Sequence, residues 1–179
     1  MNEGLVRLFR VPLREMRLAL AAPVTGLSVV LACGLAVGTA WSAPLASMGL
    51  RTTDATGCRL TDGRGFEAPT IVLMAGAYRE RSLKSDMALK IIDVAIAAGC
   101  DIDGPDALGL SPLNAAILYN EPVLVKRFLD GGANPYAKIA SQKQMLNGKD
   151  SFEFLDLLET RDKRRDRHSI RVELDTLRH

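Results

Sequence analysis

Apolar residues recur with a helical period before two glycine-containing turns of this chain. In both places they follow the spacing i, i+1, i+4, i+5, which puts them in one stripe along a helix. The residues are Ile91, Ile92, Ala95 and Ile96 in the first stripe, and Leu124, Val125, Phe128 and Leu129 in the second. The two stripes lie 33 residues apart, and so do the turns that follow them. A fixed period of about this length predicts stacked helix-turn-helix units.

The clearest unit covers residues 106–138 and predicts two short helices. Ser111 is a natural N-cap, and Pro112 falls at the first helical position, where its missing N–H is not needed. Asn120 suits a left-handed turn between the two helices. The glycine pair at 131–132 ends the second helix with the positive φ that a C-cap requires. These signals together predict a closed helix pair.

The same unit resembles an ankyrin repeat. It matches that family at the positions of its Asp, Gly, Thr-Pro-Leu, Ala, Val, Leu, Gly-Ala and Asp. In this sequence they are Asp106, Gly109, Ser111-Pro112-Leu113, Ala116, Val125, Leu129, Gly132-Ala133 and Asn134. Asn114 replaces the usual His and Tyr136 the usual Asn, which we expect to loosen side-chain hydrogen bonds between repeats. The resemblance implies an all-α solenoid of helix-turn-helix units that binds proteins.

The flanking segments are less regular than this unit. Residues 68–105 fit a degenerate repeat, in which Thr70 caps the first helix and about eight residues are inserted before the second. Residues 44–67 are rich in Gly, Thr, Ser and Asp, and they predict a linker with an irregular N-terminal edge. Residues 139–179 predict a C-terminal cap, because the last unit of a solenoid has one face in water. The ankyrin-repeat domain would thus cover residues 68–179.

Residues 18–41 contain no charged residue in 24 positions. A helix of this length would reach about 36 Å, against about 30 Å of bilayer hydrocarbon. Four arginines precede the segment and the next cations are Arg51 and Arg59, so we expect the N-terminus in the cytoplasm. Residues 1–43 are predicted to be a retained transmembrane anchor, a signal peptide cleaved near "TAWSA", or a leader lipidated at Cys33. In each case the domain is periplasmic or faces the periplasm from a bacterial inner membrane.

The net positive charge of the chain comes from its N-terminal segment. The sequence has 23 basic and 21 acidic residues. Residues 1–43 hold four of the basic and two of the acidic ones, so the remainder is neutral, with 19 of each. Nucleic-acid binding requires clustered cations that release counterions. A neutral domain argues against a nucleic-acid partner. The mixed-sign run "RDKRRDR" at 161–167 is interpreted as a solvated helix face rather than a recognition patch.

Two cysteines, Cys58 and Cys100, remain in the part that is predicted to be exported. An even pair in an oxidising compartment predicts a disulfide. The alternative is two free thiols, with Cys100 as a small buried apolar residue at a helix-turn junction.

The sequence contains none of the catalytic motifs that we sought. There is no phosphate-binding loop, no Gly-x-Ser-x-Gly and no metal-ligand spacing of His or Cys. The two histidines, His168 and His179, lie in the charged C-terminal region, where we expect them in solvent. We therefore expect no enzyme activity, no cofactor and no metal.

Ankyrin domains use their turn tips and the exposed side of the first helix to bind proteins. On residues 106–138 these positions form a mostly apolar set, and we predict that it binds a protein partner. The set is Ala107, Leu108, Leu110, Leu118 and Tyr119. The alternative is that the insertion of the preceding unit covers them. Small exported ankyrin proteins resemble immunity proteins that neutralise a secreted toxin such as a phospholipase effector. The competing role is a structural adaptor that binds or stabilises an envelope protein.

Overall fold

The computed structural model describes residues 45–46, 48–80 and 83–178. In this part of the chain three short strands precede six helices. The strands are β1 (Arg51–Thr52), β2 (Arg59–Thr61) and β3 (Glu67–Pro69), and the helices are α3 (Thr70–Ala77), α4 (Ser85–Ala97), α5 (Pro112–Tyr119), α6 (Pro122–Asp130), α7 (Ser151–Arg161) and α8 (His168–Asp175). The described chain is therefore mostly helical, which is compatible with the predicted all-α class.

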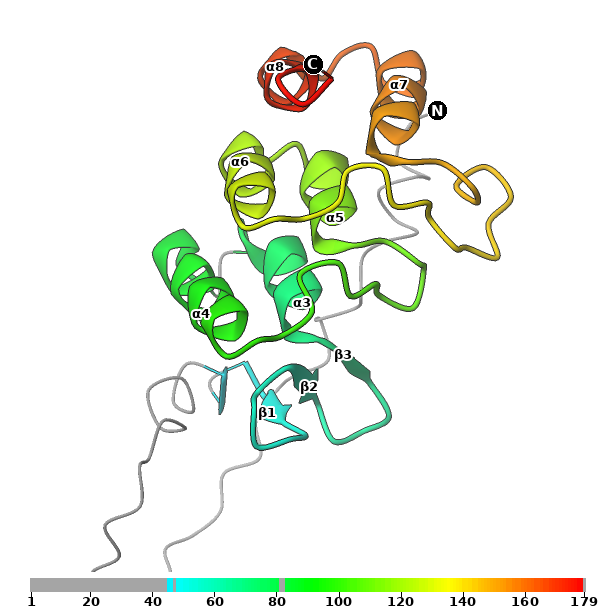
Figure 1. Cartoon of the computed structure of the whole chain (residues 1–179). Coiled ribbons are helices and arrows are strands. Elements are labelled where there is room, and N and C mark those ends of the chain that lie inside the picture. Colours follow the sequence, from blue (N-terminus) through cyan, green and yellow to red (C-terminus); the bar gives the residue numbers. More distant parts are fainter. Residues whose placement is uncertain (1–44, 47, 81–82, 179) are drawn as a thin grey trace, which may run out of the picture.

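The helices form three pairs that are stacked along one direction (Figure 1). Helices α3, α5 and α7 make one row and α4, α6 and α8 make the other. Within the first row α5 contacts both α3 and α7, and between the last two pairs α6 contacts α8. The last pair lies in the segment that the sequence assigned to a C-terminal cap. That segment thus contains a complete helix pair, because its two apolar stripes are long enough to pack on the preceding pair.

The central pair, α5–α6, follows the signals in its sequence. The Ser111 hydroxyl accepts a hydrogen bond from the Asn114 amide at 3.2 Å, so it caps α5 as predicted. Asn120 adopts the left-handed conformation with φ 63° and ψ 53°. Gly132 has a φ of +90°, while Gly131 keeps a negative φ and ends α6. Every residue of α5 from Pro112 to Leu118 is buried.

The segment that was expected to be a linker and irregular edge instead contains a small antiparallel sheet. Strand β2 pairs with β1 on one side and with β3 on the other. Thr70 does not cap α3 as expected; its hydroxyl donates to the carbonyl of Gly57 at 2.6 Å and Pro69 is the N-cap residue. Strands of two and three residues are too short to give a period in the sequence, which is why the pattern did not reveal them.

The sulfur atoms of Cys58 and Cys100 lie 2.08 Å apart, in agreement with the predicted disulfide. The bond joins the loop before β2 to the turn after α4, across 42 residues of sequence. In the chain-entropy model a closure of this length stabilises the folded state by about 4 kcal/mol. The disulfide therefore fastens the sheet to the far end of the first helix pair.

The loop between α6 and α7 joins the central pair to the last one. A Cβ atom placed on Gly109 would lie 2.1 Å from the carbonyl oxygen of Ala140, so the two backbones touch there. The Ser151 hydroxyl donates to Asn114 Oδ1 at 3.0 Å. Asn114 was expected to loosen the links between units, but here it makes a buried link of its own.

The predicted membrane anchor or signal segment, residues 1–43, lies outside the described residues. Among the residues that the structure describes, no helix has both the length and the apolar character needed to cross a bilayer.

Candidate functional site

The five residues predicted to bind a partner do not form an exposed apolar patch. Leu110 and Leu118 belong to the core, with 1% and 7% of their surface exposed. Leu108 and Tyr119 are partly buried and pack against that core, so of the five only Ala107 is exposed. Leu110 and Leu118 are therefore not exposed as the prediction assumed, because both side chains are enclosed in the hydrophobic core.

Tyr119 lies against the preceding unit, in line with the alternative that this unit covers the predicted contact residues. A Cβ atom on Gly76 of α3 would lie 3.6 Å from Cε2 of the Tyr119 ring. Burial raises the pKa of the Tyr119 hydroxyl, and the nearby carboxylates of Asp106 and Glu80 raise it further. Glu80 belongs to the insertion after α3, so part of that insertion lies near the ring.

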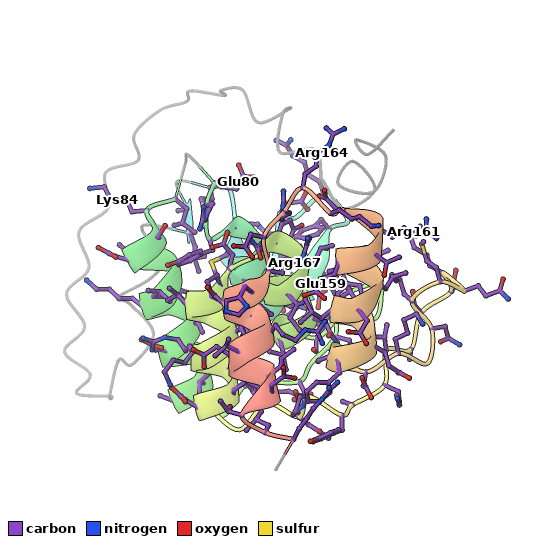
Figure 2. All side chains as sticks on the ribbon, turned by 90° about the horizontal axis from the view of Figure 1, so that it is seen from above. Glu80, Lys84, Glu159, Arg161, Arg164 and Arg167 are labelled. Atoms are coloured by element: carbon purple, nitrogen blue, oxygen red, sulfur yellow. A yellow bond between two sulfur atoms is a disulfide. The ribbon has the colours of Figure 1, made fainter. Side chains whose placement is uncertain are left out.

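Polar and charged residues gather instead where the two helices of each pair are joined. We call this side of the stack the connection edge, and Figure 2 shows Lys84, Glu80 and Arg164 along it. Asn120 Nδ2 in the α5–α6 connection donates to the carbonyl of Asp166 in the α7–α8 connection at 2.9 Å. The α5–α6 and α7–α8 connections are thus neighbours, and a hydrogen bond joins them directly.

The α5–α6 connection is linked to the first pair as well. The buried carboxylate of Glu121 receives Arg79 Nε at 2.6 Å. Burial raises the pKa of Glu121 and the Arg79 guanidinium opposes that rise. A buried charge in this connection is therefore matched by a charge of opposite sign.

The α7–α8 connection encloses an open hollow of about 550 Å³. Eight side chains line it, and they are almost all charged. They are Glu159, Lys163, Arg164, Arg165, Asp166, Arg167, His168 and Arg171. Five basic side chains thus face two acidic ones, and we call this place the basic hollow.

Arg167 is the buried member of the basic hollow, with 4% of its surface exposed. Its Nε and Nη1 atoms are inaccessible to solvent and have no hydrogen-bond partner in the described part of the chain. Burial lowers the pKa of the guanidinium, and the adjacent charge of Arg165 lowers it further. In Figure 2 Arg167 lies between the ends of α7 and α8, while Arg161 points away from α8.

Three carboxylates of this region are engaged by other groups, whereas Asp162 acts on Arg167 without a hydrogen bond to its Nε or Nη1. Arg171 Nη2 binds Asp156 at 2.6 Å and Glu159 at 2.5 Å. Burial lowers the pKa of Arg171, but these two carboxylates outweigh burial and raise it above its ordinary value. Asp166 Oδ1 accepts the amide of His168 at 2.8 Å. Among the described residues, no carboxylate hydrogen-bonds Nε or Nη1 of Arg167.

The basic hollow has an excess of cationic side chains, which attract anions. Its cationic side chains supply positive charge and N–H donors, which suit the oxygens of a carboxylate or phosphate. Helix α8 begins at the hollow, where the Asp166 carboxylate accepts the His168 amide and so already occupies part of the positive N-terminal end of the helix. Among the described residues there is no group of His, Cys, Asp or Glu that could hold a metal ion.

Sequence reasoning placed the run 161–167 on a solvated helix face. In the structure α7 ends at Arg161 and the run is the connection between two helices, with one arginine turned inward. The loss of apolar period between Leu158 and Ile170 was the available signal for a connection. Nothing in the sequence distinguishes Arg167 from the four basic residues before it.

Comparison with known proteins gives no relative for this chain: no family model, no curated protein and no solved structure matches it.

Proposed function

We propose that this protein is a non-catalytic, protein-binding module with an ankyrin-type solenoid fold, displayed in the periplasm. The stacking of three helix pairs with their connections along one edge carries the proposal. Such a scaffold holds loops in fixed positions and leaves one long surface free for a partner. The basic hollow lies on that surface and supplies charge and hydrogen-bond donors, which favours binding over turnover.

The ankyrin assignment is supported by local geometry at the turns. The Asp103 carboxylate accepts the Asn134 amide at 3.0 and 3.2 Å, which joins the turns after α4 and α6. Those two turns are the ones that repeat at 33 residues in the sequence. The N-cap at Ser111 and the left-handed Asn120 lie where that repeat requires them. These features support the family through its architecture, and fold alone does not supply the function.

Within this class we propose that the module is an immunity protein that neutralises a secreted toxin, such as a phospholipase effector. The charged leader and apolar segment of the sequence support an extracytoplasmic position, and the disulfide suits an oxidising compartment. Occupying a toxin requires a stable complex and no chemistry, which fits a rigid stack. The alternative role is an adaptor for a resident envelope protein.

A rescue experiment tests this proposal. The full chain and the product of the adjacent open reading frame are produced together, with the latter directed to the periplasm, and growth is followed. We expect the full chain to restore growth and to form a stoichiometric complex with that product by size-exclusion chromatography. A chain without residues 1–43 serves as the control and should not restore growth, because it stays in the cytoplasm. Failure of the full chain to rescue, together with a stoichiometric complex with a resident envelope protein, would favour the adaptor role.

A further inference from the structure

We propose that the basic hollow binds a carboxylate of an acidic segment in the partner protein, with Arg167 as its central cation. This inference rests on the proposed protein-binding function and names the chemistry of the surface that the partner must present. Three observations support the inference: the burial of Arg167, the side chains around it, and the position of the basic hollow on the connection edge.

The first step is the contrast between two buried charges of the same exposure. Glu121 and Arg167 each expose 4% of their surface. Glu121 is paired with Arg79, whereas two nitrogen atoms of Arg167 are buried without a partner in the described chain. Removing a charged group from water without pairing it is costly. The described chain pairs the buried charge of Glu121, whereas the buried charge of Arg167, which lines the basic hollow, belongs to no ion pair of the described residues.

The second step is that no local carboxylate takes this role. Asp162 and Glu159 act on Arg167 from a distance and favour its charged form. Neither makes a hydrogen bond to Nε or Nη1, and Glu159 is held by Arg171. The remaining cations of the hollow, Lys163, Arg164 and Arg165, belong to no ion pair of the described residues. Among the described residues no ion pair neutralises these three cations, while Arg165 acts on the Glu121 carboxylate and Asp162 acts on Arg167.

The third step selects an acidic protein segment as the source of the anion. A nucleic acid would need a broad basic face, but two carboxylates line the hollow and residues 44–179 are neutral overall. The connection edge continues from the hollow past the Arg79–Glu121 ion pair to the exposed cation Lys84. An extended segment with carboxylates at intervals fits this series of separated cations better than a compact phosphate does.

The experiment uses the full-length protein and a fluorescent hexaglutamate peptide as the probe, with hexalysine as the charge-reversed control. We expect hexaglutamate to bind and hexalysine not to bind, with affinity falling as salt is added. Arg167→Met should weaken the peptide by about tenfold or more, since a charge-assisted hydrogen bond is lost. Arg161→Gln removes the same charge from the end of α7, on a side chain that points away from α8, and should change the affinity by less than about twofold.

Thermal unfolding of Arg167→Met separates a binding role from a structural one. A methionine of similar length removes the uncompensated buried charge, so Tm should rise by about 3 °C or more. A lower Tm, or unchanged peptide binding, would overturn the proposal. If this variant does not fold, the exposed pair Lys163→Gln and Arg164→Gln provides the second test. That double variant should keep the Tm of the parent and bind the peptide at least about threefold more weakly. Unchanged binding would count against the proposal.

The two proposals fail in distinguishable ways. If the Arg167→Met variant restores growth as well as the parent chain does, the protein-binding function stands and the carboxylate site is wrong. If hexaglutamate binds as expected but no protein partner is found, the site stands and the proposed function is wrong. Binding of inorganic phosphate without any binding of hexaglutamate would overturn the carboxylate as the occupant.

Discussion

The helix pairs α5–α6 and α7–α8 have the same architecture but join their helices in different ways. In α5–α6 the connection is two residues, Asn120 and Glu121. Asn120 adopts the left-handed backbone conformation that the turn requires, and the Glu121 carboxylate is paired with Arg79. In α7–α8 the connection is six residues, all of them charged, and it buries Arg167 without partners in the described chain for two of its nitrogens. Natural proteins depart from polar satisfaction chiefly at functional sites. We therefore expect the functional site in the last pair and a scaffold role for the central pair.

The largest effects should come from the cores of the two pairs. Phe128 in α6 and Phe154 in α7 are both fully buried. Truncating a buried phenylalanine to alanine costs about 3–5 kcal/mol, and the cost depends on how far the site can collapse. We expect Phe128→Ala near the upper end and Phe154→Ala near the lower end, because the last pair has a neighbour on one side and can relax. Urea denaturation measures both.

Val123→Ala is the control on the same helix as Phe128, since 55% of Val123 is exposed. It should change the free energy of unfolding by less than about 0.5 kcal/mol. A larger loss for Phe154→Ala than for Phe128→Ala would contradict the view that the central pair is the more tightly enclosed of the two.

The contact between Gly109 and Ala140 should be the next most sensitive point, because it joins the central pair to the loop that leads into α7. Gly109 has a φ of +83°, and an added Cβ would meet a backbone oxygen that cannot move aside cheaply. We expect Gly109→Ala to cost about 3 kcal/mol, from the clash and the strained backbone together.

Gly132→Ala is the matched control for backbone strain alone. Its φ is +90° and nothing lies within 4 Å of the added Cβ. This variant should cost about 1 kcal/mol in chemical denaturation. Equal losses for the two glycines would mean that strain, and not the contact with Ala140, accounts for the effect at Gly109.

Substitutions at Asn120 distinguish two contributions to stability: the left-handed turn of the central pair and the hydrogen bond from that turn to the last pair. Asn120→Gly keeps the left-handed backbone but loses the hydrogen bond to the Asp166 carbonyl. Asn120→Ala loses the same hydrogen bond and adds strain of about 1 kcal/mol. We expect the alanine variant to be less stable than the glycine variant by that amount in urea. If both are equally unstable, the hydrogen bond between the pairs matters more than the turn.

The smallest effect should be a pH dependence in the last pair. Asp150 caps α7 and accepts the Glu153 amide at 2.9 Å. Burial raises the pKa of Asp150, but the Glu153 amide and the Lys138 ammonium outweigh it, so the pKa lies below its ordinary value of 3.8. A lowered pKa in the folded state stabilises the protein above pH 3.8, and this contribution disappears as the pH falls through the folded value.

Asp150→Ala should therefore cost about 1 kcal/mol near neutral pH, the usual value of an N-cap. The difference from the parent protein should shrink below pH 3.8 in urea titrations at stepped pH. A difference that stays constant down to pH 2 would mean that the carboxylate charge of Asp150 does not contribute.

The sequence predicted the parts of the fold that depend on local signals. Ser111, Asn120 and Gly132 have the roles expected of them, because caps and turns are set by the residue itself. The burial of Leu110 and Leu118 could not be predicted in the same way, since a helical stripe does not show how many neighbours will cover the helix.

The candidate site was still harder to predict from the sequence. Arg167 is buried in the connection between α7 and α8, although the surrounding sequence mixes charges as an exposed helix would. Asn114 gives a similar lesson, because the residue expected to weaken contacts between units finds a new partner in Ser151. Tertiary partners decided each of these outcomes.

The disulfide between Cys58 and Cys100 also determines when the molecule can be completed. The bond encloses residues 58–100, which contain two strands and the whole of α3 and α4 but none of the later helices. In the proposed periplasmic location, an oxidising environment would be needed to close this loop. The compartment, through its redox state, would then act as a maturation checkpoint on one end of the stack.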